Sequence, residues 1–197
     1  SISKLSKFCV YGLIVAVLGL GIRTIVRNGD WRNGLILYDK AIKYSPPSYE
    51  LENNYGVELF RMGKSDEARG HFEKSIQLQP KWWFAYNNLG VIYQREGDLK
   101  AAKSLYEQSL KRADYYLAYE NLAWIKLKLD KDEETEKYLD GAIGKLPAND
   151  TLRIAMAIAK YRLRKYQEAI IFARQAYSIS PSQRNSQILQ AITNKDK

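Results

Sequence analysis

Cysteine and histidine are almost absent from this chain of 197 residues, which contains one of each, Cys9 and His71. A single cysteine excludes an internal disulfide framework and a cysteine metal cluster. The remaining residues show no Ser/His/Asp or Cys/His arrangement and no phosphate-binding loop. The sequence therefore predicts no catalytic residue, no metal site and no cofactor in this chain.

Proline is also scarce, and its positions are regular. Four of the five prolines stand at one phase of a longer pattern, and both Pro46 to Pro80 and Pro147 to Pro181 are steps of 34 residues. A proline just beyond a helix prevents that helix from continuing, so these positions mark the ends of repeated helices.

The segment 84–114 shows what is repeated. An aromatic residue, a Leu-Gly pair, a second aromatic, a glycine, an alanine and a third aromatic follow one another as Tyr86, Leu89-Gly90, Tyr93, Gly97, Ala102 and Tyr106. This order resembles the tetratricopeptide repeat family, whose unit is a helix–turn–helix of about 34 residues. We expect Gly90 and Ala102 to lie where two helices cross closely, and Gly97 to supply the positive φ that ends the first helix.

The same order returns along residues 30–183, with Gly56 and Ala123 at the phase of Gly90. It predicts an all-α fold, an α-solenoid of tetratricopeptide helix–turn–helix repeats. We expect an N-terminal apolar anchor helix over 1–27 and a repeat domain over 28–197. The repeat domain divides into a half-repeat over 28–48, repeats over 49–82, 83–115, 116–149 and 150–183, and a C-terminal capping helix over 184–197.

The last two units depart from the pattern. Lys126 and Lys160 replace an aromatic of the first helix, and Asp130 and Arg164 replace the turn glycine. An acidic run over 130–136 stands at the start of a second helix, where the helix dipole favours carboxylates.

An apolar segment precedes the repeats. Residues 8–26 read FCVYGLIVAVLGLGIRTIV. The uncharged part, 8–22, would span about 22 Å as a helix, against a hydrocarbon thickness of about 30 Å. The leading interpretation is a transmembrane helix that contacts lipid through residues 8–26, with Arg23 reaching the interface. A secretory signal and an apolar helix buried against the next repeat are the alternatives.

The residues after this segment carry a second resemblance. Arg23-Thr24, Arg27-Asn28 and Trp31 resemble the junction at which the last membrane helix of multi-pass C-type glycosyltransferases, related to protein O-mannosyltransferases, leads into a tetratricopeptide tail. That resemblance implies a repeat domain outside the cytoplasm, whereas the local excess of Lys and Arg after the segment predicts a cytoplasmic one. The side of the membrane is therefore open. The catalytic acids of that family lie in early membrane loops, so none is transferred to this chain.

The net charge of +9 gathers at the two ends, with a balance of +5 over residues 1–45 and +6 over 150–197. Basic faces of helical repeats are commonly just solvated, and no nucleic-acid motif accompanies these charges. We therefore expect no nucleic-acid partner.

Candidate binding residues recur at the repeat spacing on the first helix of each unit. One row consists of Asn54, Asn88 and Asn121, whose amides can pair with the main chain of any extended peptide. It resembles the asparagine ladder of O-linked N-acetylglucosamine transferase, although asparagine can also serve the local turn. A second row would favour an acidic or carboxylate-bearing ligand and consists of Arg61, Arg95, Lys128 and Arg162. Trp124, with Val57, Val91 and Ile158, gives the groove an apolar floor.

Three functions remain open on these observations. The leading hypothesis is a membrane-tethered scaffold that binds a protein or extended peptide segment in its concave groove and catalyses nothing itself. The second is the C-terminal tail of a membrane glycosyltransferase, positioning acceptor protein. The third is a structural or assembly subunit of a larger membrane complex, held by its helix and by the Trp82-Trp83-Phe84 cluster at a repeat boundary.

Overall fold

The computed structural model of the chain describes residues 34–129 and 131–194, and this part of the chain contains ten helices and no strand. The expected all-α fold is confirmed for these residues. The expected anchor over 1–27 lies outside them. Within the same ranges, no helix combines the length and the apolar character that crossing a bilayer requires.

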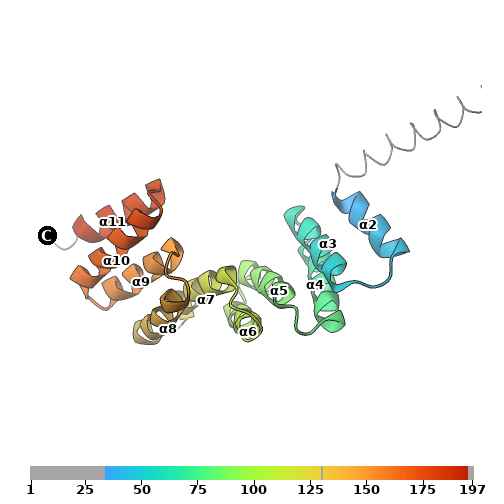
Figure 1. Cartoon of the computed structure of the whole chain (residues 1–197), viewed down its shortest axis with the longest axis horizontal. Coiled ribbons are helices and arrows are strands. Elements are labelled where there is room, and N and C mark those ends of the chain that lie inside the picture. The colour runs from blue at the N-terminus through green and yellow to red at the C-terminus, as the bar shows by residue number, and fades with distance from the viewer. Residues whose placement is uncertain (1–33, 130, 195–197) are drawn as a thin grey trace, which may run out of the picture. The chain divides into compact units, whose positions relative to one another are not determined.

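The chain forms two compact units, the first ending at Leu78 and the second beginning at Gln79. The described part of the first unit contains α2 (Gly34–Tyr44), α3 (Tyr49–Arg61) and α4 (Ser65–Leu78). Helix α3 packs against both α2 and α4 (Figure 1). Ser48 caps the start of α3 by accepting a hydrogen bond from the backbone N–H of Leu51.

The second unit is a succession of helix pairs. Its first helices are α5 (Trp83–Glu96), α7 (Tyr116–Leu129) and α9 (Asp150–Arg162), and its second helices are α6 (Leu99–Leu110), α8 (Asp132–Lys145) and α10 (Tyr166–Ile179). Helix α11 (Gln183–Asn194) closes the unit (Figure 1). Helix α9 contacts α7 before it and α11 after it, so these three helices lie side by side as a solenoid requires.

The two repeat glycines lie where the helices of a pair cross, as expected. A Cβ atom on Gly56 would stand 2.7 Å from the ring of Phe72, and one on Gly90 would stand 2.7 Å from the ring of Tyr106. Real Cβ atoms do not approach other heavy atoms so closely, so only glycine fits without a shift of the facing ring. At the corresponding place in the next pair, Ala123 is fully buried in the core.

The turn between the helices of a pair uses the left-handed region of the backbone. Gly63 and Gly97 have φ values of +80° and +89°, which glycine adopts without strain. In the last pair the same place is held by Arg164, with a φ of 60°. The fold therefore keeps the turn geometry even where the sequence has lost the glycine.

Helix α11 is fastened by one buried amide. Asn185 is 1% exposed, and its Nδ2 donates to the Oδ2 of Asp150 and to the carbonyl of Ser180, both at 2.9 Å. Ile192 of α11 joins a core cluster with Ala157 and Ala169. The helix thus covers the apolar end of the last pair.

Candidate functional site

The asparagine row runs over the first helices, and part of its hydrogen-bonding capacity is used within the protein. Asn121 on α7 donates from Nδ2 to the Oδ1 of Asn87 on α5, at 3.2 Å, and Asn87 is buried. Asn88 on α5 is partly buried. In the first unit, Asn54 is exposed and accepts from Asn53 at 3.3 Å. The Asn121–Asn87 bond therefore ties the neighbouring first helices α5 and α7 together through the amide NH₂ group of Asn121.

The residues of the cationic row differ in the partners that they contact. Arg61, in the first unit, is exposed and pairs with Glu58 at 3.0 Å on its own helix. In the second unit, Arg95 lies exposed in the last turn of α5. Lys128 is exposed near the end of α7, and no partner is found for it among the described residues.

Arg162 connects α9 to α7 and α8. Its Nη1 donates to the backbone carbonyl of Leu127 on α7 and lies 3.4 Å from the carboxylate of Asp132 at the start of α8. These contacts join the last two repeats and hold the guanidinium in place. In the second unit, Lys128 therefore has more freedom than Arg162 to meet a ligand.

Trp124, expected to form the groove floor, is partly buried on α7. Together with Ile158 it packs against the core cluster built from α7, α8 and α9. The guanidinium of Arg184, on α11, lies 5.4 Å from the centre of the Trp124 ring, within the range of a cation–π interaction. An aromatic face and an arginine from different helices thus meet on one side of the unit.

A cavity of about 330 Å³ lies between α9 and α11 and is here named the α9–α11 pocket. Its walls are Ile158, Tyr161, Arg162, Ile188, Ala191 and Ile192. The lining is mainly apolar, with Arg162 at one edge, so the pocket suits an apolar side chain that has a negative group close by.

Sequence reasoning predicted Ile158 and Arg162 on this surface and missed the contribution of α11. The helix was expected only to cap the solenoid, yet it supplies Ile188, Ala191 and Arg184. One signal was present, because a further step of 34 residues from Ile158 reaches Ile192. The capping helix thus occupies the place of another first helix.

An ionic network surrounds Lys160, the residue that replaces the usual aromatic of the first helix. Lys160 is 7% exposed and donates to Glu136 at 2.6 Å and to Glu168 at 2.5 Å, while Lys165 reaches Glu136 at 2.9 Å. Burial alone lowers the pKa of Lys160, but the hydrogen bonds to the two carboxylates outweigh it, so the pKa of Lys160 is raised. The hydrogen bonds from Lys160 and Lys165 lower the pKa of Glu136. Glu136 belongs to the acidic run over 130–136, which was expected only to interact favourably with the dipole of its own helix. Its contacts with Lys160 and Lys165 show that it also links two successive repeats.

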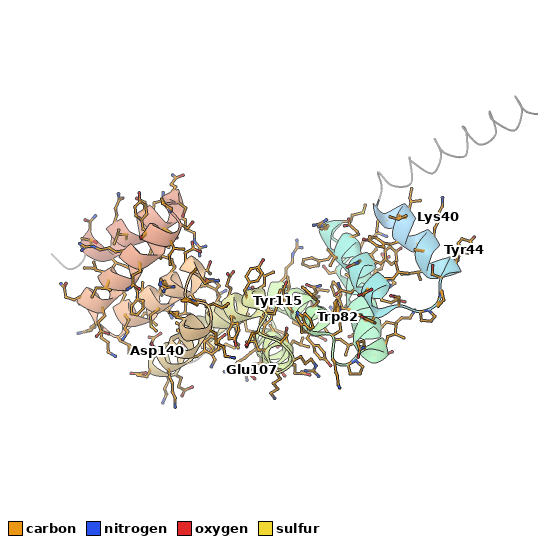
Figure 2. The ribbon with its side chains drawn as sticks, viewed as in Figure 1. Lys40, Tyr44, Trp82, Glu107, Tyr115 and Asp140 are labelled. Atoms are coloured by element: carbon orange, nitrogen blue, oxygen red, sulfur yellow. The ribbon has the colours of Figure 1, made fainter. Side chains whose placement is uncertain are left out.

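An aromatic patch stands where α5 and α7 begin. The ring centroids of Trp82, Trp83 and Phe84 lie within 5.1 to 5.3 Å of one another, and Phe84 meets Tyr115 edge-to-face at 4.7 Å. Tyr116 continues the row and is 51% exposed. Trp82 and Tyr115 are labelled in Figure 2. Most rings of the patch therefore pack against one another within the second unit, and the ring of Tyr116 is well exposed.

The lone histidine is also engaged. The Nδ1 of His71 lies 2.6 Å from a carboxylate oxygen of buried Glu52, and its ring packs edge-to-face on Tyr55 at 4.6 Å. Across residues 34–129 and 131–194, no group of three or more His, Cys, Asp or Glu side chains is arranged to hold a metal ion.

Comparison with known proteins agrees with the repeat pattern. The family model described as Tetratricopeptide repeat matches residues 48–114, so tetratricopeptide repeats are confirmed in this part of the chain. Over 68 residues the chain is 34% identical to Protein O-mannosyl-transferase tmtc2 of Xenopus laevis. The match covers 34% of this chain and 8% of that relative, so the chain is similar to a small part of it.

Solved structures share the fold at low sequence identity. MamA (41-end) from Desulfovibrio magneticus RS-1 superposes with a TM-score of 0.66 and 16% identity, over 75% of this chain and 85% of that one. YrrB, described as a TPR protein with an unusual peptide-binding site, superposes with a TM-score of 0.66 and 17% identity, over 81% and 83% of the two chains. The Cut9–Hcn1 hetero-tetramer of APC/C has a TM-score of 0.69 at 16% identity, over 86% of this chain and 34% of that one. The all-α helical-repeat fold is thus shared with all three.

Proposed function

We propose, starting from the tetratricopeptide match over residues 48–114, that the chain is an interaction module that holds an extended segment of a partner protein against its first helices. Such repeats generally serve as protein-binding scaffolds without catalysis. A peptide-binding site is named for YrrB, whose fold is similar. Both points support a binding function for this chain.

The observation that carries the proposal is the convergence of an apolar pocket with cations on the first-helix side of the second unit. The α9–α11 pocket accepts an apolar side chain. Arg162 edges the pocket, Arg184 covers Trp124, and Lys128 is exposed one turn beyond Trp124 on α7. A segment with an apolar residue and neighbouring acidic groups or a terminal carboxylate would satisfy both features.

A crosslinking experiment tests which surface the partner occupies. A photo-crosslinking amino acid replaces Lys128 on a first helix, and in a matched variant it replaces Asp140, which projects from the second helix α8 (Figure 2). We expect a partner segment to be captured from position 128 and not from position 140. Capture from both positions with equal yield contradicts binding in the groove.

The affinity of the captured segment then tests the asparagine row. Replacing Asn88 and Asn121 together with alanine is expected to weaken binding at least tenfold, since a peptide main chain loses two amide partners. Circular dichroism at helical wavelengths is expected to stay unchanged. The control is Asp140→Ala, and equal affinities for all three proteins would contradict the proposal.

We further propose that residues 8–26 tether the module to a membrane. The support is the apolar sequence of that segment, which lies outside the described residues. Deleting residues 1–26 should release the folded protein from a membrane pellet into the soluble fraction. Protease access in sealed vesicles then reports the side on which the repeats stand. Unfolding of the truncated chain would instead assign the segment to the core.

A second function is favoured by one specific observation, the 68-residue match to Protein O-mannosyl-transferase tmtc2. On this proposal the chain is the tail of a membrane glycosyltransferase, and its groove presents acceptor protein to an active site elsewhere. The junction at Arg23 to Trp31 supports the same assignment. An upstream reading frame that encodes several membrane spans with acidic loops is expected, and its absence from the gene would rule this function out.

A further inference from the structure

A second pocket of the second unit holds two arginines and no carboxylate. It has a volume of about 530 Å³ and is named here the arginine pocket. The loop between α8 and α9, the first turn of α9 and one side of α10 form it, through Pro147, Arg153, Arg174, Gln175, Ser178 and Ile179. None of these residues belongs to the groove proposed above.

Arg153 is held in position by two hydrogen bonds. Its Nε donates to the Oε1 of Gln175, and its Nη1 donates to the backbone carbonyl of Asn149, both at 3.3 Å. The guanidinium is planar and carries five N–H donors, so donors on Nη1 and Nη2 remain for a ligand. Because the amide oxygen of Gln175 accepts from Arg153, its NH₂ group is also available as a donor.

Arg174 and Ser178 stand one turn apart on α10, and neither has a hydrogen-bond or ionic partner among the described residues. The acidic residue next to this site along the chain, Asp150, accepts a hydrogen bond from buried Asn185 on α11. The segment 150–197 carries a balance of +6. The pocket therefore presents two positive charges with no opposing charge in its lining.

We propose that the arginine pocket binds the phosphate of a phosphorylated side chain on a partner protein. A phosphate monoester carries a charge of about −1.5 to −2 near neutral pH, which matches two guanidinium groups, whereas a carboxylate carries only about −1. Arginine forks suit its oxygens, and Ser178 and Gln175 offer neutral donors for the others.

The remaining walls fit the chain that would carry the phosphate. Pro147 and Ile179 are apolar, and Ile179 is 40% exposed. The volume of about 530 Å³ leaves room for the side chain that bears the phosphate and for its neighbours. The arginine pocket is separate from the first-helix groove, so the phosphate proposal does not depend on whether the groove binds a peptide.

The test uses the full chain and three immobilised peptide libraries with randomised flanks. The central residue is phosphoserine in one library, serine in the second and glutamate in the third. The phosphoserine library should retain at least ten times more protein than either of the others. Arg174→Gln should reduce that retention about tenfold, the effect of losing one charge-assisted hydrogen bond. Lys137→Gln, which removes the same charge from the exposed side of α8, serves as the control and should change retention less than about threefold.

Equal retention on the phosphoserine and glutamate libraries would overturn the assignment to phosphate. Equal losses in Arg174→Gln and Lys137→Gln would overturn the assignment to this pocket. A final arm uses phosphatidylcholine vesicles with and without phosphatidic acid. If Arg174→Gln lowers binding to the phosphatidic acid vesicles while no library is preferred, the ligand is a lipid headgroup and the proposal is wrong. Circular dichroism verifies that each variant is folded.

Discussion

Replacing Gly90 with alanine tests the helix contact on which the repeat depends. The new methyl group would stand 2.7 Å from Cε1 and 3.0 Å from Cδ1 of Tyr106. Tyr106 is fully buried, and its hydroxyl donates to the Oε1 of Gln94 at 2.7 Å. The ring therefore cannot move aside without disturbing packing and this hydrogen bond.

The expected loss of stability follows from opposing effects. Overpacking a core costs about 1–3 kcal/mol, and weakening the Tyr106–Gln94 hydrogen bond adds about 1 kcal/mol. Alanine in place of glycine inside a helix returns about 1 kcal/mol. We therefore expect Gly90→Ala to destabilise the second unit by about 1–3 kcal/mol.

Urea unfolding followed by tryptophan fluorescence measures this difference, because three of the four tryptophans, Trp82, Trp83 and Trp124, lie in the second unit. Gly141→Ala in α8 is the matched control, since a Cβ there would have no atom within 4 Å. It should stabilise the unit by about 0.5–1 kcal/mol. A Gly90→Ala protein as stable as the parent would refute the close crossing of α5 and α6.

Three other predictions concern the last repeats. Lys160→Ala leaves Glu136 and Glu168 without their shared cation, so it should lower the free energy of unfolding by about 2–3 kcal/mol, as measured by urea unfolding. A decrease below about 0.5 kcal/mol would show that the network contributes no more than an exposed ion pair. Since the folded-state pKa of Glu136 is lowered, its contribution exists above the ordinary value of 4.5 and disappears as the pH falls through the folded-state pKa. Glu136→Gln should therefore be less stable than the parent at pH 7, and the gap between them should close in acid; a gap constant with pH contradicts the ion pair. Arg164→Gly should stabilise the fold by about 0.5–1 kcal/mol because it relieves the φ of 60°, and thermal melting that shows a loss would argue against strain there.

The repeat and its close contacts were predictable from the sequence because they depend on residue size at a fixed spacing. Gly56 and Gly90 are needed wherever Phe72 and Tyr106 face them, and Gly97 is needed where the backbone turns with positive φ. Each of these requirements concerns the residue type at a single position, so it can be recognised directly in the sequence.

The state of the groove residues was less predictable because it depends on partners far away in the sequence. Arg95, Lys128 and Arg162 share one phase, yet only the structure shows Arg162 bound to the carbonyl of Leu127. The amide of Asn121 is likewise shared with Asn87, which stands one residue off the row. Spacing locates a side chain on a face but does not say what else that side chain already contacts.

Substitutions in degenerate repeats show the same difficulty. Lys126 and Lys160 both replace an aromatic, but Lys126 lies over the ring of Tyr138 at 5.4 Å, whereas Lys160 is buried between carboxylates. Each lysine depends on residues contributed by another helix. The sequence pattern identifies the departure but not its compensation.

The buried Asn185 holds α11 over an apolar surface that would otherwise be exposed. Because α11 stands where another pair would begin, removing its 12 residues would bare the faces of α9 and α10 that contain Ala157, Ala169 and Ile170. That bare end would resemble the surface on which a neighbouring pair normally stacks, and a second molecule could continue the stack. By holding α11 in place, the Asn185 amide thus keeps this apolar face of α9 and α10 covered.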